Sequence, residues 1–130
     1  MEFNVKTNKR EEFINITSYI KGAVKESGVK NGIAIIFVPH TTAGVTINEN
    51  TDPDVTIDMI NGLNEIVPNL KKFRHIEGNS DAHIKASLIG SSVTVIIENG
   101  NLKLGTWQGI YFCEFDGPRL RKFYLKIINE

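Results

Sequence analysis

The fold is decided at residues 106–128, TWQGIYFCEFDGPRLRKFYLKII. Two runs rich in β-branched and aromatic residues, Thr106–Phe115 and Arg119–Ile128, flank the turn residues Asp116 and Gly117. A connection this short joins antiparallel strands. The stretch therefore predicts a long antiparallel hairpin.

Before this hairpin, the sequence predicts further strands and about three helices. Runs of apolar residues predict strands at Phe3–Thr7, Gly32–Val38, Val45–Asn48 and Val93–Glu98. Helical spacing and end signals predict a helix from about Asn8 to Gly28 that includes Phe13, a helix from Asp52-Pro53-Asp54 to Pro68, and a short helix that Asp81 caps and that ends at Leu88. Strands outnumber helices, so the expected class is α+β, a mixed or antiparallel, sandwich-like sheet with the helices packed on it. No linker or repeat divides the chain, so residues 1–130 are expected to form a single domain.

Composition argues against several classes of partner. Fifteen basic residues balance fifteen acidic ones, so nothing favours nucleic acid or an anionic membrane as the main partner. The longest apolar run, Ile33–Pro39, is too short to span a bilayer, and the N-terminal residues have no apolar signal region. The single cysteine, Cys113, excludes an intrachain disulfide and fits a reducing compartment. These features predict a cytoplasmic protein.

The three histidines are the first candidates for chemistry. His40 ends a predicted buried strand, His75 lies in the polar loop 69–80, and His83 lies in the short helix, on a stripe shared with Ser87. Imidazole can transfer protons near neutral pH, and three imidazoles with an open fourth position form a known catalytic zinc arrangement. Their spacing matches no local metal motif, so two hypotheses stand: a shared pocket, or three unrelated histidines.

Among the acidic residues, Glu49 is the best functional candidate. Asp52 and Asp54 are expected to start a helix, whereas Glu49 has no visible capping role. The junction after the Val45–Asn48 strand is expected to bring Glu49 near His40, where it would act as a general base or a fourth metal ligand.

Glu114 needs a partner if it is buried, because it lies in an apolar strand. Arg119 and Arg121 on the next strand are the expected partners. Two interpretations remain open: a structural ion pair, or a carboxylate and an arginine that line a pocket for an anionic substrate.

Other residues could bind phosphate. Small donor-rich positions stand at the ends of elements: Thr41 and Thr42, Ser91 and Ser92, Gly105 and Thr106. Basic side chains near them are expected to be solvated: Lys71, Lys72, Arg74 and Lys85.

Four segments together resemble the YjbQ family, whose members are often labelled secondary thiamine-phosphate synthases. They are residues 40–50, HTTAGVTINEN, residues 83–92, HIKASLIGSS, residues 104–110, LGTWQGI, and residues 114–119, EFDGPR. The resemblance runs from the first strand to the last. The DGPR turn departs from relatives with a longer insertion, which puts the anion-binding arginine in doubt.

The resemblance implies a small α+β fold, a homotrimer, and a weak activity that joins a pyrimidine pyrophosphate to a thiazole phosphate. It implies zinc at His40, His75 and His83, while Mg²⁺ would suit a pyrophosphate substrate. It also implies that these positions match the family's motifs: His40, Asn48, Glu49, His75, His83, Gly105, Thr106, Trp107, Gln108 and Arg119. Trp107 would stack on a heteroaromatic ring or lie in the core.

Three functional hypotheses follow. The first is a transferase that acts on phosphorylated heterocycles, in which Thr41, Thr42 and Arg119 stabilise the leaving pyrophosphate. The second is a zinc-dependent hydrolase in which Glu49 takes the proton from a zinc-bound water. The third is a non-catalytic oligomer that binds a small phosphorylated ligand.

Overall fold

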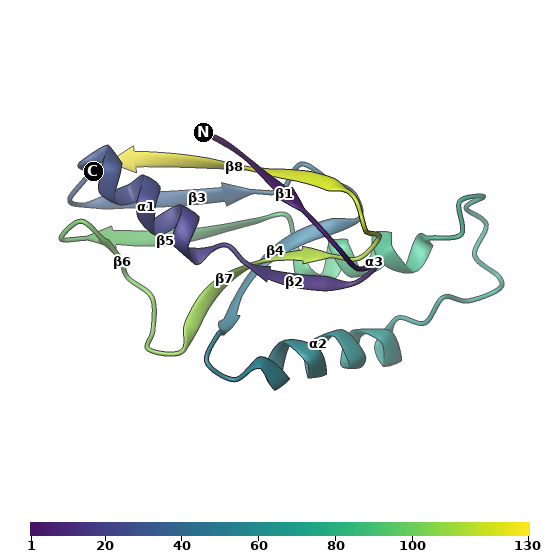
Figure 1. Cartoon of the computed structure of the whole chain (residues 1–130). Coiled ribbons are helices and arrows are strands. Elements are labelled where there is room, and N and C mark those ends of the chain that lie inside the picture. The colour runs from purple at the N-terminus through teal and green to yellow at the C-terminus, as the bar shows by residue number, and fades with distance from the viewer.

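The chain forms two antiparallel sheets and three helices, as a computed structural model of residues 1–130 shows (Figure 1). The larger sheet has the order β1-β8-β3-β5-β6, with bounds β1 (Glu2–Lys6), β8 (Leu120–Asn129), β3 (Gly32–Phe37), β5 (Ser92–Glu98) and β6 (Asn101–Leu102). The smaller sheet has the order β2-β7-β4, with bounds β2 (Glu12–Asn15), β7 (Gln108–Glu114) and β4 (Ala43–Glu49). The helices are α1 (Thr17–Ser27), α2 (Pro53–Ile66) and α3 (Ser80–Ile89). The predicted α+β class is confirmed.

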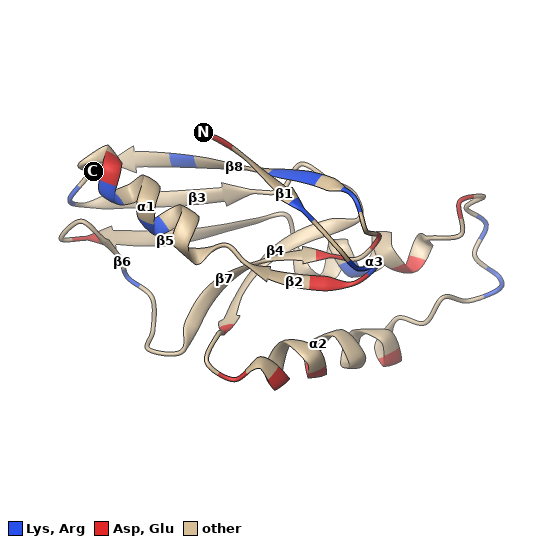
Figure 2. Cartoon of the chain, in the orientation of Figure 1, with Lys and Arg blue, Asp and Glu red and all other residues tan.

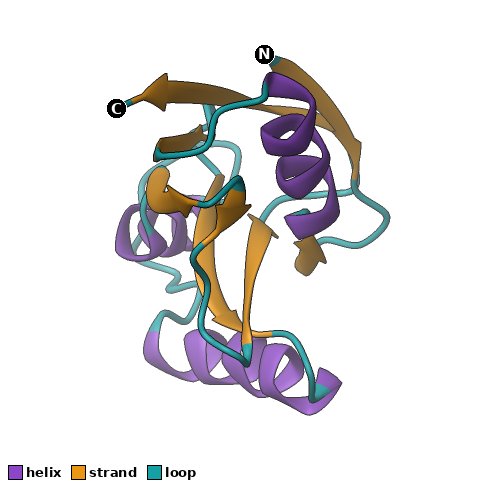
Figure 3. Cartoon of the chain, turned by 90° about the vertical axis from the view of Figure 1, so that its left-hand side faces the viewer, coloured by secondary structure: helices purple, strands orange, loops and turns teal.

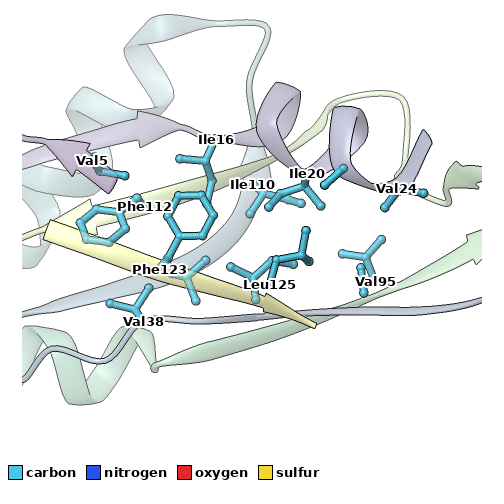
Figure 4. Close-up of a cluster of buried hydrophobic side chains, with 14 of the residues drawn as sticks. Val5, Ile16, Ile20, Val24, Val38, Val95, Ile110, Phe112, Phe123 and Leu125 are labelled. Carbon is cyan, nitrogen blue, oxygen red and sulfur yellow. The ribbon is translucent and has the colours of Figure 1, made fainter. Parts of the chain in front are cut away.

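The main core lies between α1 and the two sheets (Figures 3 and 4). Ile20 and Val24 of α1 pack with Phe112 of β7 and with Phe123 and Leu125 of β8, and all five side chains are buried. A second, smaller cluster of Ala82, Ala86, Tyr111, Cys113 and Phe115 joins α3 to the other face of β7. Alternation along β7 therefore gives one face to each core. No helix of the chain is both long and apolar enough to cross a membrane.

The helix predicted from about Asn8 is wrong over residues 8–16, because α1 begins at Thr17. Residues Glu12–Asn15 form β2 instead, where Phe13 lies opposite Cys113 of β7. Ile16, Ile20 and Val24 do repeat at helical spacing, and α1 ends at Gly28 in the left-handed conformation as predicted. Phe13 fits that spacing too, but pairing with β7 decides its conformation.

The other helices start and end close to the predicted positions. Asp52 caps α2, because its carboxylate accepts a hydrogen bond from Asp54 N at 2.9 Å. The predicted cap at Asp81 is wrong: Asn79 holds the N-cap position of α3, and the Asp81 carboxylate is turned inward to the Arg10 guanidinium at 3.2 Å. Burial beside basic groups thus decides the role of Asp81.

The predicted strand Thr106–Phe115 begins later, at Gln108. The Gln108 side chain accepts a hydrogen bond from Gly105 N at 2.8 Å, and this closes a turn over Thr106 and Trp107. These two residues are therefore presented on a loop rather than on a sheet face.

The partner of Glu114 is Arg121. Glu114 is fully buried, and Arg121 Nε donates to its Oε1 at 2.8 Å. Thr7 Oγ1 donates to the same oxygen at 2.8 Å, and Asp116 N donates to Oε2 at 3.0 Å. Burial alone would raise the pKa of Glu114, but these hydrogen bonds, led by Arg121, hold the pKa below its ordinary value. The structural ion pair is the interpretation that the geometry supports.

Lys85 contradicts the prediction that it is solvated. Its side chain is fully buried, and Nζ lies 3.0 Å from Glu11 Oε2 and 3.6 Å from Asp81 Oδ2. Nζ also donates to Asn64 Oδ1, while Asn64 Nδ2 donates to Glu11 Oε1 at 3.0 Å. Lys85 is therefore the centre of a charged cluster that ties α2 and β2 to α3.

Candidate functional site

His40 and His83 line one hollow of about 450 Å³ at the end of the smaller sheet. α3 contributes one helical face to it, and the turns on either side contribute the rest. The lining residues are His40, Thr41, Ala43, His83, Ala86, Ser87, Gly90 and Ser91. We call this the histidine hollow. The predicted stripe of His83 and Ser87 is confirmed, because spacing of four residues places both on that face.

Hydrogen bonding at a strand edge fixes the position of His40. β3 ends at Phe37, which pairs with Tyr124 of β8. The next N–H of β8 on the β3 side, that of Lys122, therefore has no partner in a strand. His40 Nε2 accepts that N–H at 3.0 Å. Burial, and then the charge of Arg121, lower the pKa of His40 below its ordinary value. The ring is therefore neutral near pH 7, and its proton lies on Nδ1 as a hydrogen-bond donor.

His75 contacts His83 but does not line the hollow. The two rings meet edge to face, with centroids 5.4 Å apart, and His75 Nε2 lies 3.9 Å from Glu77 Oε1. His83 is thus the central residue of the three, with one neighbour on each side.

A three-histidine zinc centre does not fit this geometry. No group of three or more His, Cys, Asp or Glu side chains converges in a way that could hold a metal ion. The lone pair of His40 Nε2 is taken by Lys122, and the other nitrogen carries the proton, so His40 cannot ligate a metal in this arrangement.

Two of the predicted anion-binding residues are engaged elsewhere. Thr42 is buried, and its Oγ1 accepts a hydrogen bond from Arg121 Nη2 at 2.8 Å. Arg119 binds Asp116, with Nη2 3.0 Å from Oδ2, and Asn79 Nδ2 donates to the same oxygen at 2.7 Å. Thr42 is therefore structural. Arg119 stabilises the β7–β8 turn, and Asn79 joins this turn to the start of α3.

The other predicted site residues lie at the opposite end of β4. Ala43, the first residue of β4, lines the hollow, and Glu49 is the last residue of the same strand. Six residue steps along a strand span about 20 Å. The expected approach of Glu49 to His40 is therefore wrong within one chain. We call this second group the tryptophan end; its members are Asn48, Glu49, Thr106, Trp107 and Gln108. Trp107 is 59% exposed, so it is not a core residue.

Several contributors were missed from the sequence. The backbone N–H of Lys122 orients His40, and Asn79 and Asp116 connect α3 to the β7–β8 turn. Only the i, i+4 spacing signalled Ser87. No feature of the sequence identifies a backbone N–H that lacks a partner because the neighbouring strand ends.

Gly44 allows the end of α3, including Gly90 of the hollow, to approach β4. A Cβ at Gly44 would lie 2.6 Å from Gly90 O, an impossible contact with backbone. We expect Gly44→Ala to lower the free energy of unfolding by about 1–3 kcal/mol, measured by urea denaturation. Gly62→Ala is the control, because nothing lies within 4 Å of its Cβ in the interior of α2. It should raise stability by about 0.5–1 kcal/mol, and equal effects of the two changes would contradict this packing.

The lowered pKa of His40 predicts how stability depends on pH. The folded state favours the neutral ring of His40. His40 therefore makes its full contribution to the free energy of unfolding above the unfolded pKa of about 6.5. This contribution declines as the pH falls from there through the lower folded-state pKa. An NMR titration of the His40 imidazole measures the shift directly, and a midpoint above 6.5 would contradict the structure.

Comparison with known proteins places the chain in a family. The family described as "UPF0047 protein YjbQ-like" matches residues 1–130. The chain belongs to the YjbQ family. A UPF0047 protein of Methanocaldococcus jannaschii is 61% identical over 99% of this chain and 94% of its own length. YugU of Bacillus subtilis is 54% identical, with 96% of each chain covered.

Solved structures of YjbQ relatives share the fold. A Clostridium acetobutylicum protein of the family, called uncharacterized, has a TM-score of 0.96 and 61% identity, covering 98% of this chain and 99% of its own. A protein of unknown function from Sulfolobus solfataricus has a TM-score of 0.95 and 33% identity, covering 100% and 96%. YjbQ membership thus confirms the resemblance seen in the motifs and leaves the activity open.

Proposed function

We propose that the histidine hollow binds a phosphorylated ligand, and that the protein is a transferase of the secondary thiamine-phosphate synthase type. One observation carries the proposal: the polar lining consists of the imidazoles of His40 and His83 and the hydroxyls of Thr41, Ser87 and Ser91, with no carboxylate. Imidazole N–H groups and the hydroxyls of Thr41 and Ser91 can donate to phosphate oxygens, whereas the Ser87 hydroxyl already donates to His83 O at 3.0 Å.

Two backbone carbonyls beside the hollow already have hydrogen-bond donors. Gly90 O accepts a hydrogen bond from Val45 N at 3.1 Å, and Ser91 O accepts one from Val38 N at 2.8 Å. These two carbonyls at the end of α3 are therefore occupied, while the Ser91 side chain remains exposed. A volume of about 450 Å³ suits a phosphorylated heterocycle.

The chemistry would depend on stabilising the leaving group. When the thiazole nitrogen displaces pyrophosphate from the pyrimidine, negative charge develops on the leaving oxygen. Donors already fixed in the hollow would stabilise that charge, and His40 is held as a neutral donor by Lys122 N. A Mg²⁺ ion, the divalent metal we propose, would accompany the pyrophosphate. Zinc hydrolysis with Glu49 as base has no support within one chain, because Glu49 lies at the other end of β4.

Incubation of the purified protein with both thiamine precursors and Mg²⁺ tests the activity. We expect slow formation of thiamine phosphate, and a loss of about 10²-fold or more in His83→Ala. Lys25→Ala, at the exposed end of α1 away from the hollow, is the matched control. If the native protein forms no product but binds pyrophosphate in the hollow, the protein is a binding protein rather than an enzyme.

We also propose that the protein is a cytoplasmic homotrimer. Phe37, Ile96 and Ile128 are 44–55% exposed on the outer face of the larger sheet, where β3, β5 and β8 lie side by side. α2 has no buried residue, although Val55, Met59, Leu63 and Ile66 repeat at helical spacing along it, and Ile66 is 73% exposed. Surfaces of this kind usually belong to interfaces. Light scattering should give three times the 14.5 kDa chain mass; a single-chain mass would contradict the proposal.

The one thiol, buried and unpaired, suits a reducing cytoplasm.

A further inference from the structure

The tryptophan end is rigid although it is exposed. Gly109 pairs with Asn48, and Gln108 pairs with Glu49, in the β4–β7 ladder. Asn50 N donates to Trp107 O at 2.8 Å, so the loop before β7 is tied to the end of β4. A large aromatic side chain on a fixed backbone, left 59% exposed, is typical of an anchor that contacts a partner.

The histidine hollow, in contrast, lacks what the tryptophan end carries. Its lining contains no carboxylate, and the imidazoles are its only aromatic rings. It could hold a phosphate but has no flat, apolar platform for a heteroaromatic ring. Trp107 supplies such a platform, and Glu49 supplies a carboxylate whose charge already helps to raise the pKa of Tyr111, after burial. The two ends are chemically complementary but lie about 20 Å apart along β4.

Two segments of the chain each carry charged side chains of one sign (Figure 2). Residues 31–70, which include α2 and Glu49, contain five acidic side chains and no Lys or Arg. Residues 119–128 contain four basic side chains and no Asp or Glu. Arg119 and Arg121 are already paired with Asp116 and Glu114, so Lys122 and Lys126 are the charges of this segment that face a partner. Opposite charges favour contact between the acidic region of one copy and the basic region of the next.

We infer that the complete site forms between two copies of the chain, arranged head to tail. The histidine hollow of one copy binds the phosphate portion of the ligand, and Trp107 and Glu49 of the neighbouring copy contact its heterocycle. This inference rests on the proposed function for the ligand class and on the proposed trimer, in which three such contacts close a ring. Each copy then contributes one half of two sites.

Chemical cross-linking tests the arrangement without any ligand. Cys113, the only native thiol, is fully buried and its pKa is raised by burial, so it does not react. Ser87→Cys and Thr106→Cys place exposed thiols at the two ends. After co-expression of the two variants, a short bismaleimide should join the two kinds of chain into covalent dimers. A chain that carries both Ser87→Cys and Thr106→Cys should give covalent species larger than a dimer.

The control pair is Ser87→Cys with Lys25→Cys, a position at the end of α1, away from both groups. If the Ser87→Cys and Thr106→Cys pair cross-links no more than this control, the head-to-tail arrangement is overturned. That outcome leaves the ligand proposal standing, because cross-linking depends on neither binding nor turnover.

Complementation tests the shared site itself. Trp107→Ala and His83→Ala should each be inactive when purified alone. In randomly co-assembled oligomers about a quarter of the sites combine an intact hollow with an intact neighbouring tryptophan end, so activity should return to about a quarter of the native value. No recovery in the mixed oligomers would show that each site lies within one chain.

Discussion

Arg121→Met should lower the free energy of unfolding by about 3–5 kcal/mol, because it leaves the Glu114 carboxylate buried without its cation. The methionine side chain retains most of the apolar contact, so the loss reports the charge rather than a cavity. Thr42 Oγ1 would lose its partner as well. Urea denaturation followed by circular dichroism measures the change.

Arg119→Met is the matched control, because Arg119 is half-exposed and its pair with Asp116 lies at the surface. It should cost less than about 1 kcal/mol. A double change, Glu114→Leu with Arg121→Met, should recover part of the single loss, since no buried charge then remains. A loss below about 1 kcal/mol in Arg121→Met alone would show that this pair is not buried as the structure has it.

The same ion pair predicts acid sensitivity. The pKa of Glu114 is lowered in the folded state, so its contribution to stability is complete above the unfolded pKa of about 4.3. The contribution is lost as the pH falls below that value through the folded-state pKa.

Lys85→Met should lower the free energy of unfolding by about 3 kcal/mol. The change leaves the carboxylates of Glu11 and Asp81 in a largely buried cluster, where Arg10 still contacts both. It also removes a donor from Asn64, which joins α2 to the rest of the chain. Hydrogen exchange should therefore become faster in α2 as well as in α3.

Lys71→Met, in the exposed loop before His75, is the control and should change stability by less than about 0.5 kcal/mol. Equal stability of the two variants would mean that Lys85 is solvated, as its sequence context suggested.

The sequence predicted those elements whose signals are local. Asp52-Pro53-Asp54 started a helix because capping and the helix dipole act within one turn. The predicted long hairpin is wrong: β7 and β8 are two strands adjacent in the chain, but they belong to different sheets and pair with other strands. Phe13 was misassigned because its strand exists only by pairing with β7, a partner about 100 residues away.

The site was harder to predict than the fold. His40 and His83 do line one hollow. Their common location depends on β3 ending where the N–H of Lys122 is free, and on Gly44 leaving room for Gly90. Glu49 was placed beside His40 because they are close in sequence; the length of β4 separates them. Lys85 was judged solvated because nothing in a single sequence shows which acidic residues will surround a lysine.

Titration with pyrophosphate, followed by amide and imidazole NMR signals, tests most directly whether the histidine hollow binds a phosphorylated ligand. We expect saturable shifts at the residues that line the histidine hollow, and the loss of these shifts in His83→Ala. The lining residues are His40, Thr41, Ala43, His83, Ala86, Ser87, Gly90 and Ser91. Shifts that do not saturate, or that fall on the lysines of α1 instead of the hollow, would contradict this binding.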